Sequence, residues 1–160
     1  MFKILGIDPG TGIVGFGLIN AQTGGLNLID AGVIRTRAGQ SDEVRLLTIY
    51  DELNQLIHYH KPDCVSVERL FFARNVTTAM TVSQSRGVIL LAAIQAKLKV
   101  AEYTPLQIKM AITGYGRADK KQMQEMVRVI LKLETVPKPD DAADALAAAI
   151  THAQTSAINM

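Results

Sequence analysis

The stretch Phe2-Lys3-Ile4-Leu5-Gly6-Ile7-Asp8-Pro9-Gly10 decides how the fold begins. Aliphatic residues run through it up to Asp8, and Pro9 and Gly10 then stop strand pairing and allow a tight turn. The stretch therefore predicts a buried first strand that carries a carboxylate at its end.

Two more strands are predicted directly after this one. Residues 14–20 and 26–35 are rich in aliphatic side chains, and the Thr23-Gly24-Gly25 segment between them has the composition of a tight turn. Because such short connections join antiparallel neighbours, the first 35 residues predict a three-strand antiparallel meander.

The rest of the chain alternates between helical and strand-like patterns. Helical spacing, caps and prolines mark five segments, at about residues 41–61, 76–98, 104–112, 120–132 and 140–153. Short apolar runs at 63–68 and 100–103 predict two further strands. The pattern predicts an α/β fold, with a five-stranded mixed sheet flanked by helices on both faces. Because no internal repeat or dividing linker is found, residues 1–160 are expected to form a single domain.

Length and composition limit the class of protein. With 160 residues, 48% of them apolar and 20% charged, the chain can bury a core and differs from disordered or fibrous proteins. Its longest aliphatic run, Val88 to Ile94, is far below the roughly 18 residues that cross a bilayer. A cytoplasmic protein with no membrane span is therefore expected. Cys64 is the only cysteine, which leaves oxygen ligands or histidine for any metal.

Positive charge is concentrated in the middle of the chain. Residues 64–139 hold twelve Lys and Arg against five Asp and Glu, and no acidic residue lies between Glu68 and Glu102. Such a distribution favours a polyanionic partner, nucleic acid above all. A solvated basic face would show the same pattern, so charge alone leaves both interpretations open.

Four carboxylates stand out by their positions. Asp8 and Glu68 end predicted strands, while Asp141 and Asp144 lie in the first turn of the last predicted helix and share one face of it. Strand ends and helix starts gather at one rim of an open sheet. Carboxylates packed together repel unless a cation lies among them, and Mg²⁺ or Mn²⁺ prefers oxygen ligands. Two such ions about 4 Å apart can hydrolyse a phosphodiester.

Each acid also has a simpler interpretation when it is taken alone. Asp141 and Asp144 could stabilise the helix dipole, and Asp8 could begin a turn. Asp140 is expected to cap the same helix. Glu68 is harder to explain in this way, because a lone carboxylate after an apolar strand needs a partner.

The helix predicted at 76–98 has two interpretations. Ala79, Ser83 and Gly87 recur every fourth residue, and Met80 and Leu91 fall on an apolar side of the same helix. The pattern favours packing against a second copy of the chain, yet burial in the core of one chain would explain it equally well. The methionines at 80, 110, 123 and 126 are expected to lie in the core.

Several short motifs resemble one known family. They are Ile4-Leu5-Gly6-Ile7-Asp8-Pro9-Gly10, Val67-Glu68 followed by Phe71, Ala73-Arg74-Asn75, Asp141-Ala142-Ala143-Asp144-Ala145-Leu146 and Ala149-Ile150-Thr151-His152. In this order they resemble the RuvC family of bacterial Holliday junction resolvases, within the RNase H-like nuclease superfamily. The resemblance runs from Ile4 to His152.

The resemblance implies an RNase H-like fold and a homodimer with two active sites. Each site would hold two Mg²⁺ ions, and the dimer would nick two strands symmetrically across a four-way DNA junction, in recombination and repair. Asp8, Glu68, Asp141 and Asp144 match the four metal-binding catalytic acids of the family. RuvA and RuvB, which drive branch migration, are the partners that the family implies.

The same resemblance and the charge pattern together suggest residues that contact DNA. Lys109 and Lys120 match family lysines near the phosphates, and Phe71 matches an aromatic residue at the opened junction. The basic side chains that we consider as further phosphate contacts are Arg69, Arg74, Arg86, Arg117 and Lys121.

Other functions compete with this one. The sequence from Gly6 to Gly12 also resembles the first phosphate loop of actin-like and sugar-kinase ATPases, although these proteins bind nucleotide between two such domains. A junction-binding module without catalysis would share the basic segment. A related RNase H-like enzyme that processes ribosomal RNA precursors would share the opening motif, but the basic middle of the chain favours the junction enzyme.

Overall fold

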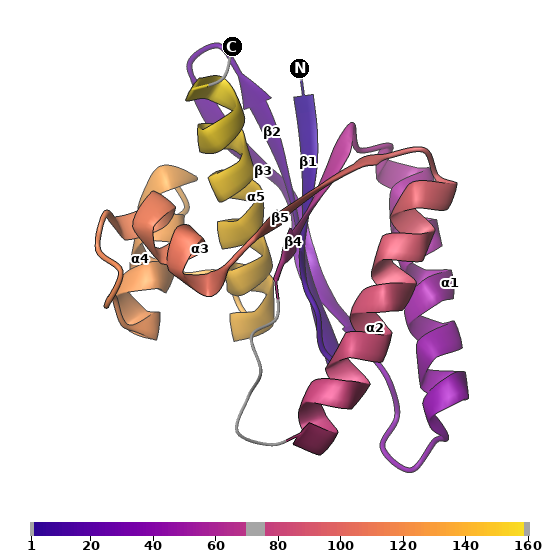
Figure 1. Ribbon diagram of the computed structural model, residues 1–160. Coiled ribbons are helices and arrows are strands. Elements are labelled where there is room, and N and C mark those ends of the chain that lie inside the picture. Colours follow the sequence, from indigo (N-terminus) through magenta and orange to yellow (C-terminus); the bar gives the residue numbers. More distant parts are fainter. Residues whose placement is uncertain (1, 70–75, 159–160) are drawn as a thin grey trace.

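A five-stranded mixed sheet forms the centre of the molecule (Figure 1). The computed structural model of the chain describes residues 2–69 and 76–158. Its strands are β1 (Phe2–Asp8), β2 (Ile13–Gln22), β3 (Gly25–Arg35), β4 (Cys64–Glu68) and β5 (Lys99–Tyr103). Its helices are α1 (Asp42–His60), α2 (Val76–Gln95), α3 (Pro105–Thr113), α4 (Lys120–Ile130) and α5 (Asp140–Ile158).

The strands lie in the order β3-β2-β1-β4-β5. The first three form the predicted antiparallel meander, and β4 and β5 continue the sheet in parallel with β1. Strand β1 is central, and Ile4, Leu5 and Ile7 on it are at most 1% exposed. A continuous aliphatic run suits a strand that is covered on both faces. The predicted α/β fold is confirmed.

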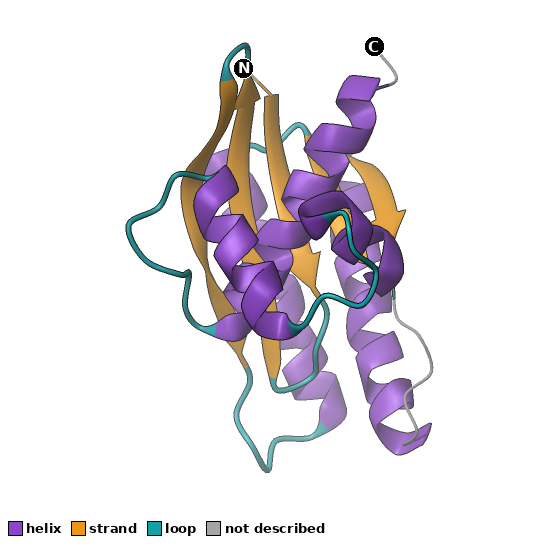
Figure 2. Ribbon diagram, turned by 90° about the vertical axis from the view of Figure 1, so that its left-hand side faces the viewer, coloured by secondary structure: helices purple, strands orange, loops and turns teal. Residues whose placement is uncertain are grey.

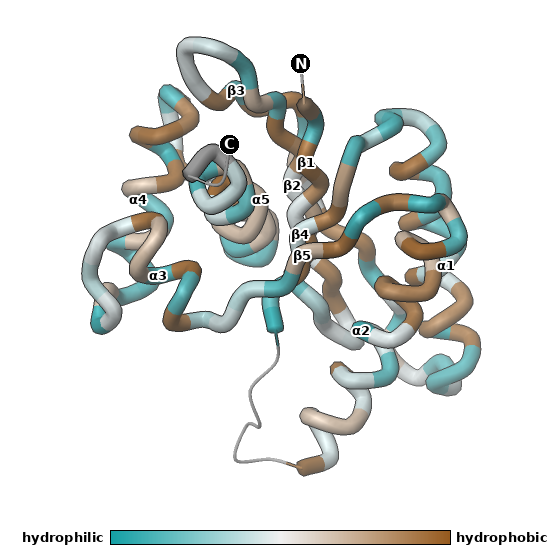
Figure 3. Tube along the Cα trace, turned by 45° about the horizontal axis from the view of Figure 1, so that its top comes forward, coloured by the Kyte–Doolittle hydropathy of each residue, from teal (hydrophilic) through white to brown (hydrophobic). Residues whose placement is uncertain are grey.

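Helices cover both faces of the sheet. Helices α1 and α2 lie on one face, while α5 lies on the other with α3 and α4 packed outside it (Figures 1 and 2). Figure 3 shows the hydrophobic strand β1 between α5 and the α1–α2 pair. The sheet therefore separates two apolar cores, one centred on Leu5 and Ile7 and the other on Ile4 and Leu146.

Glycines in the sheet let α5 approach it closely. A Cβ added to Gly6 would lie 1.9 Å from the carbonyl oxygen of Ala145, and one added to Gly15 would lie 2.0 Å from that of Asp141. A Cβ on Gly17 would meet the side chain of Leu146. These contacts place the backbone of α5 directly on β1 and β2, so the start of α5 has a fixed position over the sheet.

The structure shows which side of helix α2 faces the sheet, a point that its sequence pattern left open. Its buried residues are Ser85, Ile89, Ala92 and Ala93, whereas Leu91 is 52% exposed. The prediction that four methionines lie in the core is wrong for Met80 and Met110, which are exposed, whereas Met123 is buried and Met126 packs, partly buried, against the core. Because α2 carries apolar residues on both sides, hydropathy alone could not tell which side faces the sheet.

Two further expectations can be compared with the fold. Cys64 is buried and free, as a small apolar residue would be. Across the described ranges, no helix combines the length and the apolar character that a membrane crossing requires.

Candidate active site

Two of the four predicted acids end neighbouring parallel strands. Asp8 is the last residue of β1 and Glu68 the last of β4, and the register pairs Ile7 with Val67 just before them. Because parallel strands in this register end together, Asp8 and Glu68 lie side by side at one rim of the sheet.

The other two acids come from the first turns of α5. Asp8 pairs across the sheet with Gly15, and the carbonyl oxygen of Asp141 lies 2.0 Å from where a Cβ on Gly15 would be. Asp141 therefore lies over the strand next to Asp8, and Asp144 follows three residues later on the same helix face. The structure thus brings together all four acids that the sequence predicted.

The electrostatics of the cluster follow from this arrangement. Burial above all, and then the negative charges of Glu68, Asp144 and Asp141, together raise the pKa of Asp8 to about 8. Burial and the charge of Asp144 also raise the pKa of Glu68, although a hydrogen bond with Asp8 opposes the rise. Without a cation Asp8 therefore holds a proton that an isolated carboxylate would release at neutral pH.

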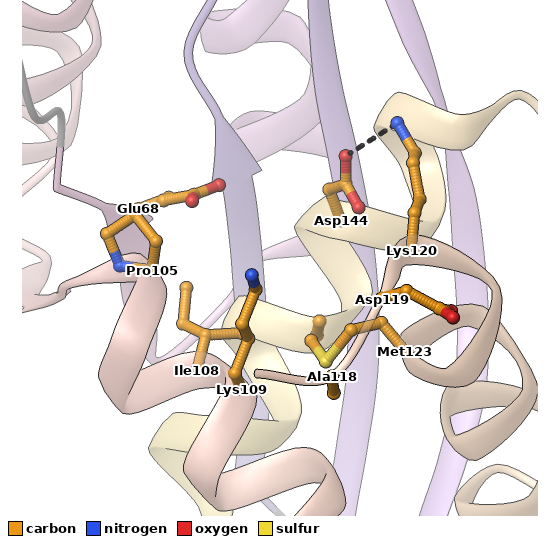
Figure 4. A pocket seen from close by; sticks show the side chains of 10 residues that line it. Glu68, Pro105, Ile108, Lys109, Ala118, Asp119, Lys120, Met123 and Asp144 are labelled. Carbon is orange, nitrogen blue, oxygen red and sulfur yellow. Dashed lines mark ion pairs between the residues drawn. The ribbon is translucent and has the colours of Figure 1, made fainter. Parts of the chain in front are cut away.

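Two lysines lie at the same rim (Figure 4). Nζ of Lys120 lies 3.5 Å from Oδ2 of Asp144 and 3.4 Å from Oδ2 of Asp140. Lys109 lines the same cavity of about 240 Å³, between Glu68 on one side and Asp144 on the other. The lysine charges lower the pKa of Glu68 and so oppose the mutual repulsion of the acids.

Asp140 has a different place from the one predicted. It is the first residue of α5, and its exposed carboxylate pairs with Lys120. The N-cap prediction is therefore wrong, because the carbonyl of Pro139 already accepts the first backbone hydrogen bond, from the amide of Ala142.

The turn after Asp8 is held by side chains that the sequence did not single out. Ser85 of α2 is fully buried, and its Oγ donates to the carbonyl oxygen of Gly10 over 2.6 Å. A Cβ on Gly10 would lie 2.0 Å from the carbonyl oxygen of Ile13, so only glycine fits this turn. A serine within a helix gives no signal in the sequence that it reaches another segment.

Apart from Lys109 and Lys120, the predicted DNA contacts fall into three groups. Arg69, Arg117 and Lys121 are exposed near the ends of β4, α3 and α4, and Lys121 lies outside the cavity that Lys109 and Lys120 line. Arg86 is instead paired with Glu102 of β5, which satisfies its charge inside the protein. Phe71 and Arg74 lie outside the described residues.

The donor set suits a hard divalent cation. All four predicted ligands are carboxylates, and burial raises the pKa of three of them, Asp8, Glu68 and Asp144. Among the described residues, no three acidic, histidine or cysteine side chains converge closely enough to hold a metal by themselves. Mg²⁺ does not require such a cage, because it usually takes one or two carboxylates together with water and substrate phosphates. The cluster therefore fits a cation that phosphate oxygens would help to hold.

Comparison with known proteins identifies relatives over nearly the whole chain. The family model described as Crossover junction endodeoxyribonuclease RuvC matches residues 4–152. The proteins of that name from Brevibacillus brevis and Heliobacterium modesticaldum are 55% and 58% identical to this chain. These matches cover 95% and 92% of this chain, and 92% and 91% of the respective relatives.

Solved structures give the same result. Thermus thermophilus RuvC, in complex with a Holliday junction substrate, matches with a TM-score of 0.94 and 34% identity, over 99% of this chain and 97% of the other. The yeast mitochondrial Holliday junction resolvase Ydc2 matches with a TM-score of 0.73 at 14% identity, over 98% and 79%, which shows a shared fold. The RNase H-like sheet and the family match agree, and the chain belongs to the RuvC family.

Proposed function

We propose that this chain is a metal-dependent endonuclease that resolves four-way DNA junctions by paired nicks. The observation that carries the proposal is that Asp8, Glu68 and Asp144, from three separate elements, lie together at one rim of the sheet. Relatives at 55% identity are named crossover junction endodeoxyribonucleases, and the Thermus relative was solved with a junction substrate. Family membership favours this function over an ATPase or a ribosomal RNA nuclease.

The four acids are the proposed metal ligands. Asp8, Glu68, Asp141 and Asp144 would hold two Mg²⁺ ions, and Mn²⁺ would use the same oxygen donors. When bound, such ions activate water and stabilise the leaving oxygen of a phosphodiester. The protein's part is to hold Asp8 and Glu68 on rigid strand ends and to keep the carboxylates together despite their repulsion.

The two lysines supply positive charge beside the acids. Lys120 already pairs with Asp144, and Lys109 lines the same cavity. Their flexible side chains would neutralise and orient the scissile phosphate as DNA approaches. A phosphate that draws Lys120 away would leave Asp144 free to bind metal, so DNA and metal would assist each other's binding.

The exposed face of α2 supports a homodimer. Met80, Leu91 and Ile94 are 63%, 52% and 62% exposed, and open space surrounds Gly87. Such an apolar face on a helix suits contact with a second copy of the chain. Two copies would provide the two active sites that paired nicks require.

Other parts of the proposal rest on family membership alone. Residues 1–160 would act as a single nuclease domain in the cytoplasm. RuvA and RuvB would deliver the junction.

Cleavage of a mobile four-way junction tests the proposal. The wild type with Mg²⁺ should produce symmetric paired nicks, and a chelator should abolish them. Asp8→Asn should abolish nicking while junction binding persists, whereas Asp51→Asn, which changes an exposed carboxylate on α1, should cut like the wild type. Binding without any nicking by the wild type would favour a junction-binding module, and tight ATP binding without cleavage would favour the ATPase.

A further inference from the structure

Arg45 is fixed against the turn that follows Asp8. It lies near the start of α1, and its Nε donates to Oγ1 of Thr36 over 2.9 Å. The same hydroxyl donates to the carbonyl oxygen of Thr11 over 2.7 Å, and the amide of Thr36 donates to the carbonyl oxygen of Gly12 over 3.0 Å. The guanidinium is therefore attached to the turn through a short chain of hydrogen bonds.

The outer nitrogens of Arg45 remain available. Arg86 and Arg128 each pair with a glutamate, whereas no acidic side chain in the described ranges forms an ion pair with Arg45. Its Nη2 lies 3.3 Å from where a Cβ on Gly12 would be. Within the described ranges Nε makes the only side-chain hydrogen bond of Arg45, and neither Nη atom is an enclosed polar atom that lacks a partner, so both are open to a ligand from solvent. A half-buried arginine held by Nε, with both Nη groups free, is ready to bind an oxyanion in a bidentate manner.

Arg45 lies on the opposite side of the acids from the two lysines. Lys109 and Lys120 belong to α3 and α4, on the α5 side of the sheet, while Arg45 belongs to α1 on the other side (Figure 1). The turn that anchors Arg45 connects β1 to β2, at the rim where Asp8 ends β1. A DNA strand lying across the acids would therefore meet positive charge on both sides of the sheet.

We propose that Arg45 binds a phosphodiester of the substrate DNA, on the α1 side of the acidic cluster. The ligand class is a backbone phosphate, which the two Nη groups would contact together while Thr36 fixes the direction of the guanidinium. This inference rests on the proposed function, because it requires DNA to cross the rim. It adds a contact on the side of the sheet away from the lysines.

The salt dependence of junction binding tests this contact. Binding would be measured without divalent metal over a series of KCl concentrations. Arg45→Gln should weaken binding about tenfold. It should also reduce the slope of log K against log salt by about 0.9 for each phosphate contact removed.

Three matched variants separate charge from structure. Arg45→Lys keeps the charge but loses the planar fork, so it should keep the slope of the wild type with weaker binding. Thr36→Val removes the anchor but keeps the arginine, so its slope should also stay near that of the wild type. Arg128→Gln removes an arginine that is already paired with Glu125 on α4, and it should change neither quantity.

The outcomes distinguish this inference from the proposed function. If the wild type binds and nicks junctions but Arg45→Gln has an unchanged slope, the phosphate contact is wrong and the proposed function stands. If Arg45→Lys, which keeps the charge, lowers the slope as much as Arg45→Gln does, the charge at this position does not contact a phosphate and the proposed contact is again wrong. If the wild type does not bind junctions at all, both the proposed function and the proposed contact of Arg45 are wrong.

Discussion

The two long helices on opposite faces of the sheet, α5 and α2, are similar in length and apolar character but differ in what surrounds them. From Ala142 to Ile150 every residue of α5 except Asp144 is buried, whereas α2 buries one side and exposes Leu91 and Ile94 on the other. Helix α5 lies between the sheet and α3–α4, while α2 has no cover on its outer side within the described chain. The apolar residues of α5 thus fix the position of the acids that it carries. Those on the outer side of α2 leave a surface that a partner could cover.

We expect the largest loss of stability from a substitution at the close contact between α5 and the sheet. In Gly6→Ala the new methyl group would collide with the backbone of Ala145, which cannot move without shifting α5. The expected loss is about 3 kcal/mol of unfolding free energy. Gly87→Ala on α2 meets open space and should stabilise its helix by about 1 kcal/mol. Urea denaturation of both variants measures the contrast, and equal tolerance of the two would contradict the proposed difference between the helices.

The cluster of Asp8, Glu68, Asp141 and Asp144 predicts that the stability of the protein depends on pH. Because folding raises the pKa of Asp8 from 3.8 to about 8, its contribution to stability is complete below pH 3.8 and is lost as pH rises through about 8. The loss is on the order of a few kcal/mol. With a chelator present, the Tm of the wild type should therefore fall between pH 5 and pH 9.

The matched variant for this prediction is Asp8→Asn, which removes the ionisable group. Its Tm should fall less over the same pH range, and it should exceed that of the wild type at pH 9. Parallel curves for the two proteins would mean that Asp8 ionises normally and that the carboxylates do not repel one another in the folded chain.

On the buried side of α2 we expect a substitution to cause an intermediate loss of stability. Ser85→Ala leaves the carbonyl oxygen of Gly10 without its hydrogen bond, at a cost of about 1–3 kcal/mol. Ser83→Ala, on the exposed side of the same helix, should change stability by no more than about 0.5 kcal/mol. Thermal melts of the pair measure the difference, and similar melts would show that Ser85 does not support the turn.

The outer side of α2 predicts the smallest change in monomer stability. Leu91→Glu should alter the unfolding free energy by about 0.5 kcal/mol or less, because the side chain is exposed. It should nevertheless convert a dimer into a monomer, as sedimentation would show, whereas Val129→Glu on exposed α4 should leave the dimer intact. A wild type that sediments as a monomer at micromolar concentration would remove the basis for paired nicks.

The comparison of helices also explains which features the sequence predicted. Strand β1 and its terminal Asp8 follow from an aliphatic run that ends in proline and glycine, and Asp141 and Asp144 follow from their spacing on a helix. These are local patterns, so sequence reasoning reached them. Sequence reasoning failed where tertiary neighbours decide, as with Met80, which was expected in the core but is exposed.

The contacts around the turn were missed for the same reason. Ser85 lies 75 residues from the carbonyl of Gly10 that accepts its hydrogen bond. Arg45 reaches the turn only through Thr36, on the loop between β3 and α1. No spacing rule connects such distant positions, because the folded sheet brings them together.

Counting the protons released on metal binding would test most directly whether the clustered carboxylates exist to hold a cation. Calorimetric titration of Mg²⁺ at pH 7, in two buffers of different ionisation enthalpy, measures that number. Since Asp8 has a pKa of about 8, the wild type should release close to one proton as Mg²⁺ binds, and Asp8→Asn should release far fewer. Binding without proton release, or equal release by both proteins, would contradict the account.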